Sequence, residues 1–146
     1  MLNYKIGIAC DHAGFALKQT VIAWLKEQGA QVTDYGCPST DSCDYPDFAA
    51  LAAEAVASGA CERGIVVCSS GIGVSIVANK VPGIRCAHCH DVYCAKYTRF
   101  HNDANMISLG ARVVGPGSAL KIIDTFLDTP FSNDERHMRR IAKIEK

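Results

Sequence analysis

The stretch that decides the fold runs from residue 64 to residue 73 and reads Gly-Ile-Val-Val-Cys-Ser-Ser-Gly-Ile-Gly. Its continuous apolar run at 65–68 is typical of a strand that is covered on both faces, as in parallel sheets. The small residues after Cys68 predict a tight turn, and a helical pattern then continues to about Lys80. A buried strand that turns directly into a helix indicates an α/β protein.

The same alternation extends along the whole chain. Other short strands are predicted at 5–10, 31–35, 84–89 and 106–109, and the run at 84–89 is the weakest because it mixes polar and apolar residues. Further helices are predicted around 17–25 and 48–55, over 92–100 and 118–127, and from about 134. Without a repeat or a linker, residues 1–146 are expected to form a single domain. The expected fold is α/β and Rossmann-like, with three layers and a mostly parallel five-stranded sheet that has helices on both faces.

Two of the predicted helices have a recognisable apolar face. The first carries Leu17, Val21, Trp24 and Leu25, and Gly29 ends it. The second is expected to pack through Phe48, Leu51, Ala52 and Ala55.

Composition excludes several classes of partner. The chain has 15 Lys and Arg against 15 Asp and Glu, so a net charge of zero makes nucleic acid an unsuitable partner. No apolar run approaches the ~18 residues of a membrane helix, and residues 1–5 lack the layout of a signal peptide. Eight cysteines in 146 residues fall below the ~8–10% of a secreted disulfide scaffold. We therefore expect a cytoplasmic protein with reduced thiols and no membrane partner.

Reactive side chains follow several of the predicted strands. Asp11 and His12 follow the first strand, Cys68 ends the third, and His90 follows the fourth. Because ligands bind beyond the carboxyl ends of the strands in such sheets, these residues are candidates for a site. The alternative is structural, with Asp11 as a helix cap and His12 as a surface residue.

The turn at 69–73 has the features of an anion cradle. Its small residues leave backbone N–H groups accessible at the start of a helix, where negative charge is favoured. The same partial positive charge favours a thiolate at Cys68, although most cysteines are inert and buried. Gly71-Ile72-Gly73 also begins a dinucleotide fingerprint, but Ile76 stands in place of its third glycine. We therefore expect no nicotinamide cofactor.

Residues 86–94 contain potential zinc ligands at Cys86, His88, Cys89, His90 and Cys94. In an extended strand Cys86, His88 and His90 face one way and Cys89 faces the other, and no second C-x-x-C pair completes four ligands. We therefore predict no metal site.

Two polar clusters lie nearer the C-terminus. The first contains His101 and Asn102, where the histidine either exchanges protons with a substrate or sits at a capped helix end. The second contains Arg136 and Arg140 on one helix face. These arginines either bind a phosphate or form an ordinary solvated face.

Motifs spread over nearly the whole chain resemble the ribose-5-phosphate isomerase B family, within a sugar-phosphate isomerase group that includes the galactose-6-phosphate isomerase subunits. The matching stretches are 10–15, 44–46, 68–73, 78–80, 83–85, 101–105, 110–115, and Arg136-His137 with Arg140. The resemblance implies a sugar-phosphate isomerase domain that interconverts ribose 5-phosphate and ribulose 5-phosphate without metal or other cofactor. It also implies a homodimer or homotetramer whose active sites lie between subunits.

The resemblance further implies a role for individual residues. Cys68 is similar to the family's base, which moves a proton between C1 and C2, and Ser70 lies beside the enediolate. His101 is similar to the residue that opens the sugar ring, with Asp11 as its partner. The backbone at Gly71 and Gly73 would stabilise the oxyanion. The implied substrate-binding residues are Tyr45 and Asn102 for hydroxyls, and His12, Arg112, Arg136, His137 and Arg140 for the phosphate.

Two positions depart from the family pattern, and two other functions stay open. Ser69 replaces a usual glycine and Ser70 replaces a usual threonine, which matters if Ser69 needs a positive φ. The alternatives are an isomerase of a hexose 6-phosphate, such as allose or galactose 6-phosphate, and a non-catalytic subunit that binds sugar phosphates. The cysteine base favours a pentose or allose substrate.

Overall fold

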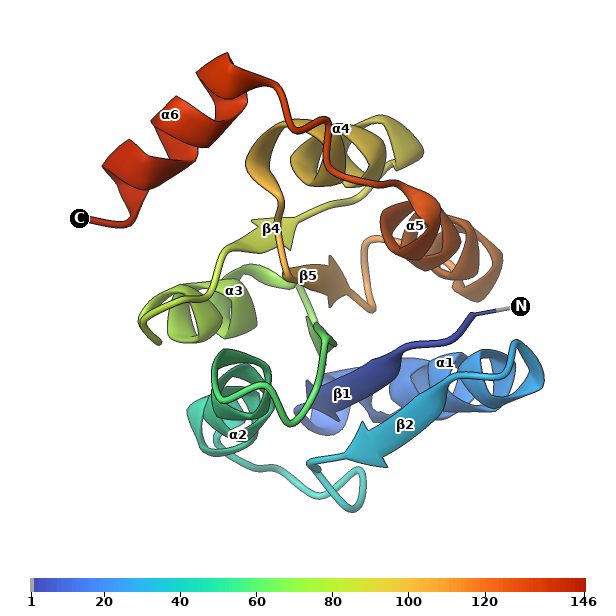
Figure 1. Ribbon diagram of the computed structural model, residues 1–146. Helices are drawn as coiled ribbons and strands as arrows, with labels where there is room; N and C mark the ends of the chain where they lie inside the picture. Colours follow the sequence, from blue (N-terminus) through green and yellow to red (C-terminus); the bar gives the residue numbers. More distant parts are fainter. Residues whose placement is uncertain (1) are drawn as a thin grey trace.

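Five parallel strands form one sheet in the computed structural model, which describes residues 2–146 (Figure 1). The order across the sheet is β2-β1-β3-β5-β4, and every pair of neighbours is parallel. The strands are β1 (Lys5–Cys10), β2 (Gln31–Asp34), β3 (Arg63–Cys68), β4 (Cys86–His88) and β5 (Met106–Gly110). This arrangement confirms the predicted parallel sheet.

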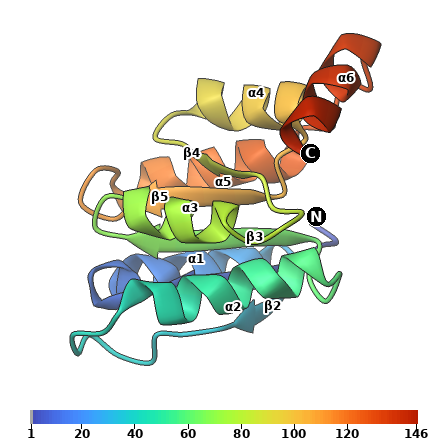
Figure 2. The same ribbon diagram turned by 90° about the vertical axis from the view of Figure 1, so that its left-hand side faces the viewer.

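Helices cover both faces of the sheet, as predicted. Figure 2 shows α2 and α3 on one face and α1, α4 and α5 on the other, with α6 at the end of the molecule beside α4. The helices are α1 (Phe15–Glu27), which follows a short 3-10 turn at His12–Gly14, α2 (Tyr45–Ala57), α3 (Ile72–Asn79), α4 (Val92–Asn102), α5 (Pro116–Asp128) and α6 (Glu135–Ile144). No helix within residues 2–146 is long and apolar enough to cross a membrane.

The alternation of side chains along β3 divides the core into two layers. Ile65 and Val67 pack in the cluster that includes α1 and α5, whereas Val66 and Cys68 pack in the cluster that includes α2 and α3. Successive side chains of a strand point to opposite faces, so this division follows from the period of two. It places the Cys68 thiol on the side of α2 and α3, at the carboxyl end of the central strand.

The predicted packing face of α2 is wrong at Leu51, which is 45% exposed. The helix instead packs through Ala49, Ala52, Ala53 and Val56, all of them buried. These residues recur at the i, i+3, i+4 and i+7 spacing of one helix face. Their small size lets α2 lie close to the sheet, and this leaves the larger Leu51 pointing outward.

Candidate active site

A cavity of about 600 Å³ lies at the carboxyl ends of β1 and β3. It is lined by many of the residues that the sequence predicts for the site, from the strand ends or from the family resemblance. These are Asp11, His12, Tyr45, Cys68, Ser70, Gly73 and Arg112, with Ala13, Ser69, Ile72 and Ile76 beside them. The rule that ligands bind beyond the strand ends therefore locates this cavity.

Cys68 lies at the last position of β3 and is only 5% exposed. Its Sγ accepts a hydrogen bond from the Gly71 N–H at 3.1 Å. The Ser70 Oγ lies 4.0 Å from the same sulfur and accepts the Ile72 N–H at 3.2 Å. The sulfur and the hydroxyl thus both meet backbone donors where α3 begins, an arrangement that stabilises negative charge.

The turn between β3 and α3 requires glycine at position 71 but not at position 69. Gly71 has φ +79°, and a Cβ there would come within 2.8 Å of the Leu109 carbonyl carbon and 2.9 Å of His88 Nε2. Ser69 is not among the non-glycine residues with positive φ, which in residues 2–146 are Asp103 and Asn133. The Ser69 side chain is therefore compatible with the turn.

Asp11 and His12 have structural partners as well as a place in the cavity. Asp11 Oδ1 accepts the Gly14 N–H at 3.0 Å, which makes it the cap of the 3-10 turn. His12 Nδ1 accepts the Cys43 N–H at 3.3 Å, so the neutral ring carries its proton on Nε2. The loop before α2 thereby fixes the orientation of the His12 ring.

The Tyr45 ring lines the cavity and lies against the first turn of α3. A Cβ on Gly73 would lie 2.6 Å from Tyr45 Cε1, so the ring packs directly on the glycine backbone. Gly73 therefore has a space-making role in addition to supplying its N–H at the start of α3.

A second cavity, of about 360 Å³, contains the other predicted residues: His101, Asn102, Arg136, His137 and Arg140. The His101 and His137 rings stack with their centroids 4.4 Å apart, and Ser132 Oγ lies 2.9 Å from His137 Nδ1. Burial, followed by the nearby His101 and Arg136, lowers the pKa of His137 from its ordinary value. An uncharged His137 between two arginines at neutral pH limits the repulsion within this basic cluster.

The two cavities lie at opposite ends of the sheet within one chain. Cys68 ends a strand, whereas His101 lies at the end of α4, which runs back toward the start of β5. Figure 2 accordingly shows α6 at the end of the molecule where the N-terminus lies. Asp11 lines the first cavity and His101 the second, so the pairing of Asp11 with His101 is not formed within one chain.

Comparison with known proteins shows which family the chain belongs to. A family model described as Ribose/Galactose Isomerase matches residues 6–144. The chain belongs to this family. Membership confirms the resemblance and the predicted enzyme class, an aldose–ketose isomerase.

Relatives match the isomerase over nearly its full length. Ribose-5-phosphate isomerase B of Escherichia coli is 43% identical, over 96% of this chain and 93% of the relative. A D-erythrulose-4-phosphate isomerase of Pectobacterium atrosepticum is 47% identical, over 87% of this chain and 84% of the relative.

Solved structures of related enzymes have the same fold over nearly the whole chain. A ribose-5-phosphate isomerase B of Clostridium thermocellum has a TM-score of 0.95 and 52% identity, covering 97% of this chain and 95% of the other. The Mycoplasma genitalium enzyme with bound ribulose 5-phosphate has a TM-score of 0.94 and 38% identity, covering 99% and 96%. These likenesses confirm the fold class.

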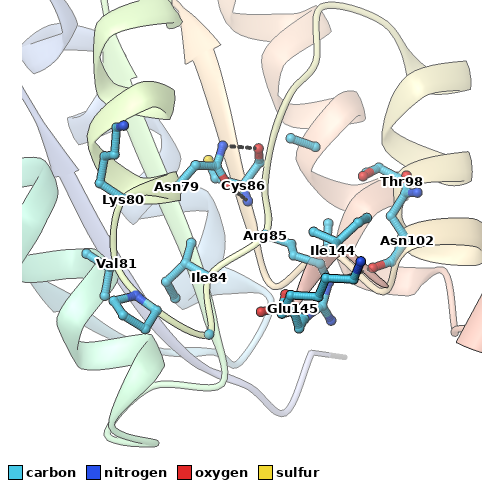
Figure 3. A pocket seen from close by; sticks show the side chains of 15 residues that line it. Asn79, Lys80, Val81, Ile84, Arg85, Cys86, Thr98, Asn102, Ile144 and Glu145 are labelled. Atoms are coloured by element: carbon cyan, nitrogen blue, oxygen red, sulfur yellow. Dashed lines mark hydrogen bonds and ion pairs between the residues drawn. The ribbon is translucent and has the colours of Figure 1, made fainter. Parts of the chain in front are cut away.

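The isomerase has a third cavity, of about 740 Å³, between the end of α3, β4 and the end of α6 (Figure 3). Arg85 on its wall donates to Glu145 Oε1 at 2.7 Å, to the Asn102 carbonyl at 2.8 Å and to the Asp103 carbonyl at 2.9 Å. It therefore ties the end of α6 to the end of α4, where His101 and Asn102 lie. Sequence reasoning noted Arg85 only as part of a matching motif, because its partners are distant in sequence.

No group of three or more His, Cys, Asp and Glu side chains within residues 2–146 is arranged to hold a metal ion. Burial raises the pKa of the Cys86 and Cys89 thiols to about 12. Both thiols are therefore protonated at neutral pH.

Gly71→Ala is expected to destabilise the isomerase more than Gly59→Ala. Both glycines have positive φ, +79° and +84°, but a Cβ at Gly59 meets nothing within 4 Å. The clash at Gly71 should therefore cost at least about 2 kcal/mol beyond the backbone strain that both variants share. Urea unfolding measures both free energies, and equal losses would show that the turn accommodates a side chain.

Proposed function

We propose that the isomerase interconverts ribose 5-phosphate and ribulose 5-phosphate through an enediolate, with Cys68 as the base and no metal ion. The observation that carries the proposal is the Cys68 sulfur, which faces a cavity and accepts the Gly71 N–H at 3.1 Å. The names of the Escherichia coli and Clostridium thermocellum relatives, and the ribulose 5-phosphate bound in the Mycoplasma genitalium structure, support this choice of substrate.

The chemistry requires a base that serves two neighbouring carbons. Cys68 removes the proton from C2 of the open-chain aldose and returns it to C1, while the proton of the C2 hydroxyl moves to the C1 oxygen, so that C2 becomes the carbonyl carbon of the ketose. Negative charge then develops on the substrate oxygen beside the sulfur. The Gly73 N–H and the Ser70 hydroxyl would stabilise it, whereas the Gly71 N–H is donated to the Cys68 sulfur at 3.1 Å. One donor to an oxyanion is worth ~10²–10³ in rate in other enzymes.

Ring opening needs a second acid or base, and we assign it to His101 with Asp11 as its partner. These residues lie in different cavities of one chain, so the complete site takes Cys68 and Asp11 from one subunit and His101 from another. Ile72 and Ile76, on the rim of the first cavity, are 52% and 56% exposed, and covering them would favour association. We therefore expect a homodimer or homotetramer with active sites between subunits.

The phosphate would bind where arginine and histidine side chains gather across this interface. Arg136, Arg140 and His137 come from the second cavity, and Arg112 and His12 from the first. Guanidinium groups fit phosphate because they donate paired hydrogen bonds. Tyr45 and Asn102 would hold the sugar hydroxyls.

Isomerisation of ribose 5-phosphate tests the proposal, and Cys68→Ala tests the base. We expect ribulose 5-phosphate to form in the presence of a chelator, and Cys68→Ala to lower kcat at least ~10²-fold with little change in substrate binding. Cys94→Ala, at an exposed thiol outside the cavity, is the matched control. Near wild-type turnover by Cys68→Ala would remove the thiol from the mechanism.

The same assay separates the alternatives. A panel with allose 6-phosphate, galactose 6-phosphate and D-erythrulose 4-phosphate identifies a different preferred sugar. Binding of these sugars without exchange of the C2 hydrogen would instead indicate a non-catalytic subunit.

Mixing two inactive variants tests the shared site. If Cys68→Ala and His101→Ala subunits assort randomly into dimers, half of the dimers carry one intact site, and about one quarter of wild-type activity returns. The control mixture, Cys68→Ala with Asp11→Ala, damages the same cavity and should stay inactive. The absence of recovery in the first mixture, with subunit exchange verified by mass spectrometry, would contradict a site between subunits.

Arg140→Ala is expected to raise KM more than it lowers kcat. A phosphate contact far from C1 and C2 contributes similarly to substrate and transition-state binding. Arg139→Ala is the matched control, because Arg139 is also exposed on α6 but does not line the cavity. Steady-state kinetics distinguish the two, and equal KM values would assign Arg140 to an ordinary solvated face.

A further inference from the structure

Three hydrogen bonds to consecutive carbonyl groups fix the turn that follows Cys68. The Cys68 carbonyl accepts the Ala111 N–H at 2.8 Å, and the Ser69 carbonyl accepts the Arg112 N–H at 3.0 Å. The Ser70 carbonyl lies 2.8 Å from His88 Nε2. Two of these donors belong to the backbone after β5, and the third is a side chain from the edge strand β4.

His88 is oriented by its neighbours to make this contact. A carbonyl oxygen only accepts, so the contact with Ser70 requires the proton on His88 Nε2. His90 packs edge-on against the ring, with centroids 4.3 Å apart, and its Nε2 lies 3.1 Å from His88 Nε2. Burial, followed by the adjacent His88, lowers the pKa of His90. An uncharged His90 can accept a share of the same N–H and hold the ring in place.

The Ser70 carbonyl and the Gly71 N–H belong to one planar peptide group. In a trans peptide the two bonds point in opposite directions, so the partner of the carbonyl also sets the direction of the N–H. At one edge of this peptide group the oxygen meets His88 at 2.8 Å, and at the opposite edge the N–H meets Cys68 Sγ at 3.1 Å. The His88 ring on β4 and the Cys68 thiol at the end of β3 are therefore linked through a single rigid peptide group.

We propose that His88 is a positioning residue for Cys68: by holding the Ser70 carbonyl, it aims the Gly71 N–H at the sulfur. This inference rests on the proposed function only for its kinetic consequence. Its chemical consequence, a better stabilised thiolate, is a property of the protein alone.

A purely structural role for His88, as an anchor of β4, has to be separated from this one. Another side chain already performs such anchoring. Asn79 Nδ2 donates to the Cys86 carbonyl at 2.9 Å (Figure 3), and its Oδ1 accepts the Cys86 N–H at 2.8 Å. Asn79→Ala therefore loosens the same strand without touching the turn, which makes it the matched control.

The test compares His88→Leu, His88→Gln and Asn79→Ala. At fixed pH near neutrality, iodoacetamide should alkylate Cys68 at least ~3-fold more slowly in His88→Leu than in the wild type, because a less well aimed N–H stabilises less thiolate. Mass spectrometry resolves each cysteine, and exposed Cys94 serves as the internal standard. His88→Gln, which places an amide donor near the position of Nε2, should restore most of the rate.

The variants that slow the alkylation of Cys68 should also lower kcat. We expect His88→Leu to lower kcat at least ~10-fold with KM within about 2-fold of wild type, since less of the thiolate that removes the substrate proton is then available, while the substrate contacts are unchanged. Asn79→Ala should lower the melting temperature while leaving kcat and Cys68 alkylation near wild type.

Three outcomes would overturn the inference. These are unchanged Cys68 alkylation in His88→Leu, an equal loss of alkylation in Asn79→Ala, and no recovery in a folded His88→Gln. If the wild type failed to isomerise ribose 5-phosphate, the proposed function would fall, but the alkylation experiment would still decide the role of His88.

Discussion

The orientation of one peptide group, between Ser70 and Gly71, is the constraint on which the site depends. It presents an N–H to the Cys68 sulfur at 3.1 Å, and it can do so because Gly71 adopts φ +79°. Glycine is required there for conformation and for space, since a Cβ would come within 3 Å of both the β5 backbone and His88.

The second feature of the molecule is the distance between the two cavities that contain the candidate site residues. A helix that follows a parallel strand must run back to the opposite end of the sheet, where the next strand begins. His101 at the end of α4 is therefore carried away from Cys68 at the end of β3, whatever the side chains are. A single copy of this fold does not bring the two together, and this separation is the physical basis on which we propose a site between subunits.

Much of the architecture follows from local patterns in the sequence. The apolar run at 65–68 and the small residues after it correctly predicted the central strand and the turn, because burial on both faces and sharp bends each restrict composition. Leu51 was misplaced because periodicity does not show that an alanine face packs closer to a sheet than a leucine face. A strand was predicted at the mixed run 84–89, but only Cys86–His88 forms one. This strand lies at the edge of the sheet, where fewer backbone groups have to be paired than in a central strand.

The sequence by itself determined the fold class and the family, because these depend on residue types at short spacings, and the same patterns predicted the candidate site residues. Only the tertiary structure decided which of those residues meet. It separated His101 and the tail arginines from Cys68, paired Arg85 with Glu145, and set His88 against Ser70. Such contacts join residues 18 to 60 positions apart, and their geometry is set by the packing of strands and helices rather than by any local pattern.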